Sequence, residues 1–112
     1  MKRYCFALDL KDDEQLIKEY EDYHAAIWPE IKKSILDAGI TQMEIYRTGN
    51  RLFMIMDTTD NFSFEQKSAM DATNEKVQEW EQLMWKYQQA VPAAKPGEKW
   101  VETRRIFRLQ PI

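Results

Sequence analysis

The sequence predicts an α+β domain in which strands and helices follow one another in the order β-α-β-β-α-β. Segments with apolar residues at every second position flank segments with apolar residues three and four apart, and a Gly49-Asn50 pair joins the two central alternating segments. A chain of 112 residues is the size of one compact domain, so we expect a single domain over residues 1–112. This order is typical of a ferredoxin-like sandwich, a four-stranded antiparallel sheet with two helices on one face.

The first half of the chain predicts a strand and then a helix that is interrupted once. Residues 2–11 alternate with the period of a strand, and an aspartate at position 12 or 13 can cap the helix that follows. The apolar face of this helix repeats at helical spacing: Leu16, Ile17, Tyr20, Tyr23, His24 and Ile27. Pro29 disfavours helical geometry at Trp28, so we expect the helix to kink or restart there and to end at Gly39.

The second half predicts a hairpin, a second helix and a last strand. The expected elements are strands over residues 42–48 and 51–58, a short helix or irregular segment over 62–70, a helix from Asn74 to about Gln89, and a final strand from Trp100 to Leu109. Gly49 suits the first central position of the two-residue turn in the hairpin. Pro92, Pro96 and Gly97 mark a loop before the last strand.

Two of the predicted strands are apolar on both faces, which bears on assembly. In residues 4–8 and 52–56, apolar or small side chains occupy both sets of alternating positions. Two helices can cover only one face of the sheet, so the second face needs another cover. We therefore predict a homodimer in which a second copy packs sheet against sheet.

Composition and charge exclude several classes of function. The net charge of −3 leaves no basic excess to neutralise phosphates, so nucleic acid is not an expected partner. No apolar run approaches the roughly 20 residues of a membrane helix, and the N-terminal segment alternates as a strand where a signal peptide would be continuously apolar. We therefore expect no membrane association and a cytoplasmic location. Cys5 alone cannot form an internal disulfide, and one cysteine with one histidine is too few for a zinc site, so no metal is expected.

His24 is the only histidine in the chain and therefore the first candidate for proton transfer near neutral pH. Tyr20 lies four residues earlier, so the two side chains are neighbours on one helix face and can approach the same small molecule. An amphipathic helix that simply buries both side chains, with their polar tips bonded to the backbone, accounts for the same spacing. The spacing alone leaves both interpretations open.

Tyr46 and Trp80 are candidate walls of a ligand pocket. If Met43 and Ile45 face a partner sheet, alternation turns Tyr46 toward the helices and so toward His24. An imidazole, a phenol and aromatic walls would suit a polyhydroxylated ligand with one apolar side. Tyr46 as an ordinary strand residue, and Trp80 as a core residue of the second helix, explain the pattern as well.

A motif around His24 resembles one protein family. The run Tyr20-x-x-x-His24-x-x-Ile27-Trp28-Pro29-Glu30 is followed by Glu44-Ile45-Tyr46, Leu52-Phe53, Trp80 with Met84, and a closing Arg-x-Phe-x-Leu segment. Together these pieces closely resemble the L-rhamnose mutarotase family over essentially the whole chain. That family is known for dimeric ferredoxin-like α/β barrels that interconvert the α and β anomers of deoxyhexoses without a cofactor.

The resemblance implies a cofactor-independent isomerase whose small-molecule ligand is a 6-deoxy-L-hexose. The implied site residues are His24 as the proton donor, Tyr20 as the second catalytic group, and Tyr20, Tyr46, Trp80, Glu81 and Trp28 as residues at the sugar. Trp28 can equally be structural. Glu81 follows Trp80 where the family commonly has a second tryptophan, so one aromatic wall of the sugar site is changed. The resemblance puts L-rhamnose first as the substrate, and the change at Glu81 makes L-fucose the alternative.

Two other classes of function stay open at this point. A dimeric α/β barrel that binds a hydrophobic cofactor, such as a haem-degrading or quinol-type monooxygenase, would use His24 as an axial ligand. A non-catalytic regulatory domain would bind a metabolite in the same pocket without converting it. A Soret band on haem addition would indicate the first class, and sugar binding without anomer exchange the second. Neither class accounts for the run from Tyr20 to Glu30.

Overall fold

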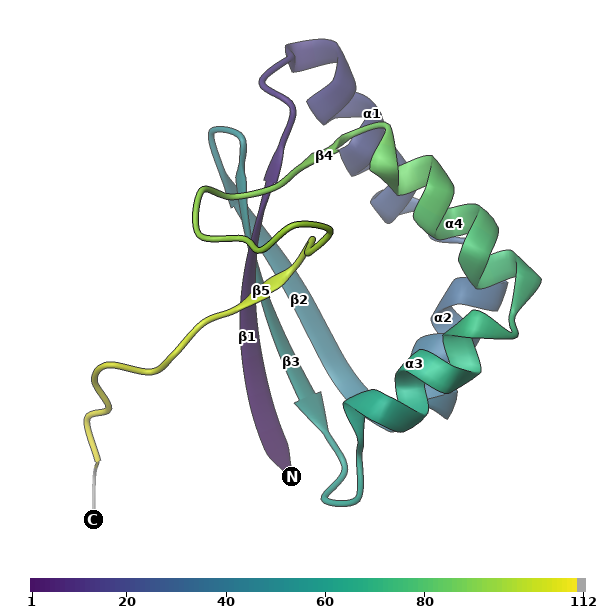
Figure 1. Cartoon of the computed structure of the whole chain (residues 1–112), viewed down its shortest axis with the longest axis vertical. Helices are drawn as coiled ribbons and strands as arrows, with labels where there is room; N and C mark the ends of the chain where they lie inside the picture. Colours follow the sequence, from purple (N-terminus) through teal and green to yellow (C-terminus); the bar gives the residue numbers. More distant parts are fainter. Residues whose placement is uncertain (111–112) are drawn as a thin grey trace.

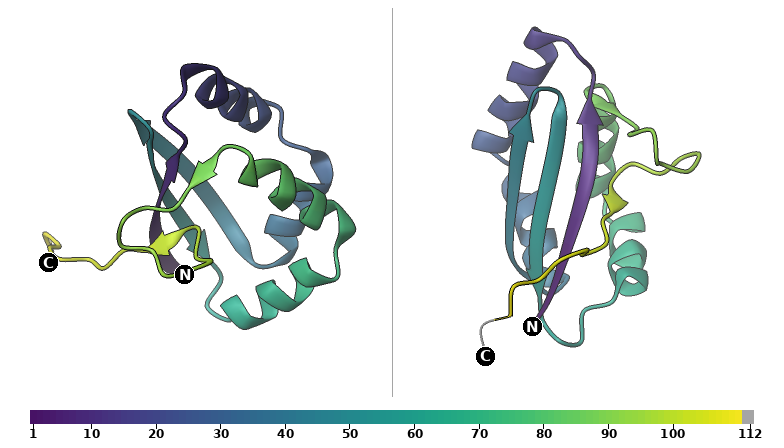
Figure 2. Two further views of the ribbon diagram at one scale, coloured as in Figure 1. Left: turned by 45° about the horizontal axis from the view of Figure 1, so that its top comes forward. Right: turned by 90° about the vertical axis from the view of Figure 1, so that its left-hand side faces the viewer.

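Helices cover one face of an antiparallel sheet in the computed structural model of the chain, which describes residues 1–110 (Figure 1). The elements are β1 (Lys2–Leu10), α1 (Glu14–Ala25), α2 (Pro29–Asp37), β2 (Ile40–Thr48), β3 (Arg51–Thr58), α3 (Phe64–Ala72), α4 (Glu75–Trp85), β4 (Gln88–Gln89) and β5 (Val101–Glu102). The predicted order is confirmed, with each helical segment divided in two. Two further views show the helices arching over the same side of the sheet (Figure 2).

The sheet is antiparallel, with strand order β2-β3-β1-β4 and with β5 also paired to β1. β1 and β3 pair along almost their whole length, from Lys2 opposite Thr58 to Asp9 opposite Arg51. β2 and β3 form the predicted hairpin, in which Gly49 takes a positive φ of 57° at the first turn position. The long strands therefore form the floor of the space beneath the helices.

Local sequence signals set the bounds of the first two helices. Asp13 caps α1, because its side chain accepts a hydrogen bond from a first-turn backbone N–H at 3.0 Å. Trp28 is extended, with φ −60° and ψ 134°, and Pro29 is the first residue of α2, so the predicted restart is confirmed. The break covers residues 26–28, directly after α1, whose last turn carries His24.

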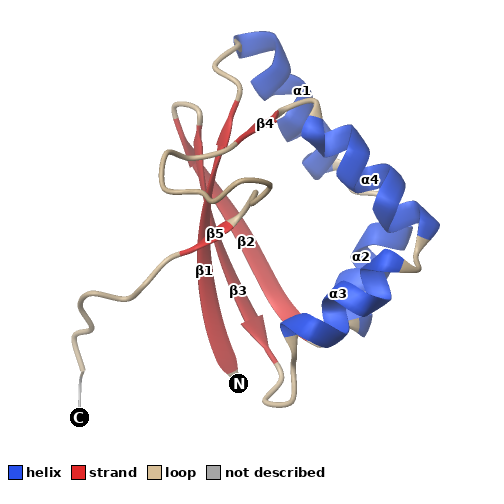
Figure 3. Cartoon of the chain, in the orientation of Figure 1, coloured by secondary structure: helices blue, strands red, loops and turns tan. Residues whose placement is uncertain are grey.

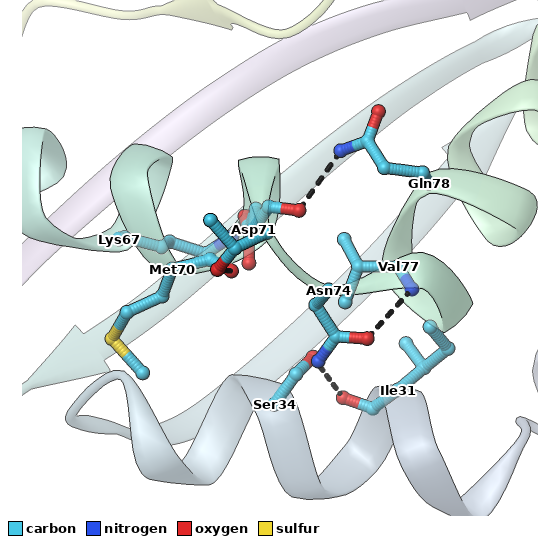
Figure 4. A network of polar contacts seen from close by, with 9 residues as sticks. Ile31, Ser34, Lys67, Met70, Asp71, Asn74, Val77 and Gln78 are labelled. Carbon is cyan, nitrogen blue, oxygen red and sulfur yellow. Dashed lines mark hydrogen bonds and ion pairs between the residues drawn. The ribbon is translucent and has the colours of Figure 1, made fainter.

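A side-chain cap fixes the start of α4 beside α2 and α3 (Figure 4). The side-chain carbonyl of Asn74 accepts hydrogen bonds from the backbone N–H groups of Lys76 and Val77, at 3.1 and 3.2 Å. The Gln78 side chain donates to the backbone carbonyl of Asp71 at 2.9 Å, which ties the first turn of α4 to the end of α3. These contacts orient α4 so that its apolar side faces the sheet.

The core lies between the two layers that Figure 3 separates by colour. The larger cluster of buried residues comprises Leu8, Leu10, Tyr20, Ile31, Leu52, Val77, Trp80, Met84 and Tyr87. A smaller cluster comprises Ile40, Met54, Met56 and Phe62. Ile35, Ile45 and Trp100 pack against both clusters. Within residues 1–110, no helix has the length and apolar character that a membrane-crossing segment requires.

The second predicted helix is shorter than expected. α4 ends at Trp85 instead of at about Gln89, and Gln88 and Gln89 form the short strand β4 beside the end of β1. Next to this pairing, the backbone N–H of Lys11 donates to the carbonyl of Tyr87 at 2.8 Å. The predicted helix was too long because Tyr87 continues the apolar spacing of this helix. Tyr87 is buried, but it lies directly before β4 and not in the helix.

The predicted final strand from Trp100 to Leu109 is wrong over most of its length. Of the predicted strand, only the two residues of β5 pair with β1, and a hydrogen bond from the Thr103 backbone N–H to the Cys5 carbonyl follows them. Residues 104–110, here called the C-terminal arm, then leave the sheet (Figure 1). Three apolar residues of the arm are largely exposed: Ile106 by 88%, Phe107 by 76% and Leu109 by 79%. A strand needs a neighbouring strand, and none of the described residues provides one beside the arm.

Candidate active site

A cavity of about 320 Å³ lies between the sheet and the helices. Its wall on the sheet side is apolar and comprises Phe6, Met43, Ile45, Met54 and Met56. Elements far apart in sequence supply polar and aromatic groups: Tyr20 and His24 from α1, Trp80 and Glu81 from α4, Gln88 from β4, and Lys99 from the loop before β5. An apolar hollow with a few convergent polar groups is typical of a small-molecule site.

His24 is held in a defined tautomer and orientation. Its Nδ1 lies 2.9 Å from the backbone carbonyl oxygen of Tyr20, and because a carbonyl only accepts, Nδ1 carries the hydrogen. Nε2 is therefore the nitrogen that can exchange a proton with a molecule in the cavity. The imidazole packs against the Tyr20 ring with centroids 4.3 Å apart and meets the Trp80 ring at 5.4 Å.

Burial decides the charge of His24 at neutral pH. Loss of solvent lowers the pKa of His24 below its ordinary value, and the hydrogen bond to the Tyr20 carbonyl opposes this shift. The neutral imidazole, with a lone pair on Nε2, therefore predominates at pH 7. In this form the side chain can accept a proton on Nε2.

Trp80 forms an aromatic wall of the cavity beside His24. Trp28 packs against the far side of this wall, with the two indole centroids 5.2 Å apart, and it is not among the residues that line the cavity. Of the two tryptophans predicted at the ligand, only Trp80 lines the cavity. Trp28 supports Trp80 from behind.

Tyr20 is buried, and it lines the cavity beside His24. Desolvation raises the pKa of Tyr20 to about 12, although a hydrogen bond with the Gln88 side chain acts in the opposite direction. The phenol stays protonated at neutral pH, and its O–H can donate to a ligand.

The structure adds polar groups that the sequence did not indicate. Gln88 and Lys99 line the cavity, and so does the ion pair between Lys67 and Asp71. Desolvation lowers the pKa of the Lys99 ammonium, against the charge of Glu81. No motif marks these positions, because Gln88 falls in a predicted helix and Lys99 in a predicted loop. Within residues 1–110, no three His, Cys, Asp or Glu side chains come together as a metal site requires.

Tyr46 lies on the face of the sheet that points away from the cavity. Met43 and Ile45 line the cavity, so alternation along β2 turns Tyr46 outward. Its side chain is 53% exposed, and its hydroxyl donates to the Glu44 carboxylate at 2.5 Å. The predicted orientation of β2 is therefore wrong, because the apolar side chains of this strand pack under the helices. Within one copy of the chain, Tyr46 and His24 are on opposite sides of the sheet.

Comparison with known proteins gives a consistent family. The model of a family described as L-rhamnose mutarotase matches residues 3–109. The chain is 46% identical to the L-fucose mutarotase of Xanthomonas campestris pv. campestris, over 97% of this chain and 89% of that protein. It is 37% identical to the L-rhamnose mutarotase of Phocaeicola vulgatus, over 86% of this chain and 85% of that protein.

Solved structures share the fold at low sequence identity. An L-rhamnose mutarotase from Formosa agariphila matches with a TM-score of 0.71 and 21% identity, over 98% of this chain and 100% of that chain. The tetracenomycin F2 cyclase of Streptomyces glaucescens matches with a TM-score of 0.61 and 13% identity, over 100% of both chains. The predicted ferredoxin-like fold class is thereby confirmed. The match over nearly the whole length, together with the two similar curated proteins, shows that this chain belongs to the L-rhamnose mutarotase family.

Proposed function

We propose that this chain interconverts the α and β anomers of a 6-deoxy-L-hexose in the cavity between the sheet and the helices. Membership of the family supports the reaction. The observation that carries the assignment to this cavity is His24, the only histidine of the chain, which lies in the wall with Nδ1 bonded to the backbone and Nε2 left for a ligand. The unpaired Cys5 supports a reducing, cytoplasmic setting for the enzyme.

Mutarotation moves two protons and breaks and re-forms one bond. The anomeric hydroxyl O1–H loses its proton, the ring oxygen O5 gains one, and the C1–O5 bond opens to give an aldehyde. Rotation about the C1–C2 bond and addition of the O5 hydroxyl to the other face of the carbonyl close the opposite anomer. No electrons are gained or lost, so positioned acid and base groups are sufficient.

His24 and Tyr20 take the two proton-handling roles in this proposal. Neutral His24 accepts the O1–H proton on Nε2 as the ring opens, and it returns that proton as the ring closes. Tyr20 donates its O–H proton to the ring oxygen O5 as the C1–O5 bond opens, and it takes that proton back from the O5 hydroxyl as the ring closes. The resemblance implied that His24 is the proton donor, and in this proposal the donation comes in the second half of the cycle, which the lowered pKa of His24 supports.

The walls of the cavity suit a deoxyhexose with one apolar side. Trp80 presents an indole to the C–H face of the ring, and the methionines of the sheet can contact the C6 methyl group. The motif resemblance put L-rhamnose first, but the chain is more similar to the relative named for L-fucose, at 46% identity, than to the relative named for L-rhamnose, at 37%. We therefore propose L-fucose as the preferred sugar and L-rhamnose as the alternative.

NMR saturation transfer between the two anomeric protons tests this function with each sugar separately. Wild type should accelerate exchange between the anomers. At the same concentration, the rate catalysed by His24→Ala should be about 10²–10⁴-fold lower. Lys18→Ala, an exposed change on the same helix, is the matched control and should behave as wild type. No acceleration of either sugar by wild type would refute the function. Full exchange by a folded His24→Ala variant would refute the assignment of the site.

We also propose that the working form is a homodimer in which a second copy covers the outer face of the sheet. The outer face has an apolar centre around Phe53 and Ile55, opposite the face that lines the cavity. Two cross-strand ion pairs frame this centre: Arg3 with Asp57 at 2.7 and 3.0 Å, and Arg51 with Asp9 at 2.8 and 3.1 Å. An apolar centre with a charged rim is typical of a protein interface. The C-terminal arm supplies further exposed apolar side chains for the same contact.

Sedimentation equilibrium tests the dimer. Wild type should have twice the mass of one chain, and Phe53→Lys should have the mass of one chain because it puts a charge in the apolar centre. Leu36→Lys is the control, because Leu36 is an exposed apolar residue on α2 and lies outside the proposed interface. A wild-type mass equal to one chain at micromolar concentration would refute the dimer.

A further inference from the structure

Gln88 combines deep burial with an incomplete set of hydrogen bonds. The residue is only 7% exposed, and its side-chain oxygen Oε1 is buried without a hydrogen-bond partner. Among residues 1–110, it is the one buried side-chain nitrogen or oxygen in this condition. Because buried polar atoms are almost always paired in folded proteins, an unmet acceptor calls for a partner from outside the chain.

The backbone of β4 directs the Gln88 side chain toward the cavity. Gln88 lines the cavity and Gln89 is exposed, as expected for consecutive residues of a strand. The pairing of β4 with β1, in which Gln88 lies opposite Leu10, fixes this orientation. The side-chain oxygen Oε1 has no partner among the described residues, so it is the part of Gln88 that remains for a ligand.

We propose that Oε1 of Gln88 accepts a hydrogen bond from one hydroxyl of the sugar in the cavity and so helps to determine which sugar binds. This inference rests on the proposed function, because it assigns a role in binding the same substrate class. Tyr20 lines the same cavity, and its phenol O–H can donate to the ligand. Gln88 and Tyr20 then present one acceptor and one donor to the same molecule. In the free protein a water molecule can take the place of the sugar hydroxyl.

In the part of the chain that the structure describes, the sheet side of the cavity offers no competing acceptor to Oε1 of Gln88. The sheet side of the cavity offers methionine and isoleucine side chains, which form no strong hydrogen bonds. A site built to pair with a hydroxyl discriminates against an analogue that lacks it, because the buried acceptor then stays unpaired. The expected consequence is strong dependence of binding on one particular hydroxyl of the sugar.

Binding titrations with a series of analogues test the proposal. The ligands are the parent sugar and four derivatives that each lack one hydroxyl, at C1, C2, C3 or C4. Gln88→Met keeps the length of the side chain and removes the acceptor, and it should weaken binding of the parent sugar about tenfold. For one of the four derivatives, wild type and Gln88→Met should bind equally. Gln89→Met, the neighbouring and exposed position, is the matched control and should bind every ligand as wild type does.

Thermal unfolding separates this role from a structural one. If Gln88 serves the ligand, Gln88→Met should unfold at the same temperature as wild type or higher, because it removes an unpaired buried acceptor. A variant with lower stability and unchanged sugar affinity would overturn the proposal. So would an affinity loss that is equal for the parent sugar and for all four derivatives.

The outcomes also distinguish this inference from the proposed function. Sugar binding that depends on Gln88, in a protein that does not accelerate anomer exchange, would refute the function and support the inference. Catalysed exchange with unchanged binding in Gln88→Met would support the function and overturn the inference. Absence of any sugar binding by wild type would overturn both.

Discussion

The pH dependence of anomer exchange follows directly from the burial of His24. The proposed mechanism uses the neutral imidazole, so kcat/KM should fall to half at the pKa of His24 in the free enzyme and tenfold for each pH unit below it. Burial lowers this pKa below the ordinary histidine value of about 6.5. At pH 6.5 the enzyme should therefore keep more than half of its plateau rate, and the acidic midpoint should lie below that pH.

Two independent measurements can locate this midpoint. The rate profile comes from saturation transfer between pH 5 and 8, and the pKa comes from the imidazole C–H resonance, which is unambiguous because the chain has a single histidine. Trp80→Phe shrinks the wall that lies 5.4 Å from the imidazole, so it should admit water and move both midpoints up toward 6.5. Trp85→Phe, an exposed change on the same helix, is the control. A wild-type midpoint at or above 6.5 would refute the link between burial and catalysis.

Three further predictions concern stability, each measured by urea unfolding. The pKa of His24 is lower in the folded protein than in the unfolded chain. The contribution of His24 to the free energy of unfolding is therefore complete above a pH of about 6.5, and it is lost as the pH falls from about 6.5 through the pKa of the folded state. His24→Gln should therefore give a flatter pH dependence below pH 6.5, and a slope equal to that of wild type would contradict this. Gly39→Ala should lower the free energy of unfolding by about 1–2 kcal/mol, because it puts a side chain at φ 98°. The loss should be larger still because the new Cβ would lie only 3.0 Å from Thr59 Oγ1. Gly49→Ala is the comparison, because a Cβ added at Gly49, at φ 57°, would meet no atom within 4 Å. It should lower the free energy of unfolding by less than Gly39→Ala does, and equal losses would show that the clash at Gly39 is absent. Leu8→Ala should cost about 2–5 kcal/mol because Leu8 is 1% exposed in the core, and a loss under 1 kcal/mol would contradict its placement there.

Much of the fold was predictable because its signals are local. Asp13 caps α1, Pro29 begins α2, and Gly49 turns the hairpin, each through geometry that involves only a few neighbouring residues. The pair of Tyr20 and His24 on one helix face was predictable for the same reason, and the structure places both in the cavity wall. Helical spacing determines such neighbours without any knowledge of the rest of the chain.

The remaining features depend on contacts between distant segments. β4 replaces the end of a predicted helix because Gln88 and Gln89 meet β1, some 80 residues earlier in the chain. The inward face of β2 was misassigned because both faces of the neighbouring β3 are apolar, so alternation alone does not say which face the helices cover. The arm after β5 alternates as a strand does, but no described strand is available for it to join. Gln88 could not have been recognised as a site residue without the pairing that turns it inward.

The early end of α1 has an electrostatic consequence for the proton that His24 carries. His24 lies in the last turn of this helix, where the unpaired carbonyl groups concentrate the negative end of the helix dipole. Pro29 stops the helix from continuing past this turn, so the negative end stays beside the imidazole. When the neutral imidazole of His24 accepts a proton and becomes a cation, the negative end of the helix dipole stabilises it. In the proposed mechanism the helix break therefore stabilises the transient positive charge of His24 in a hollow whose sheet side is apolar, which helps the imidazole to hold a proton briefly and return it.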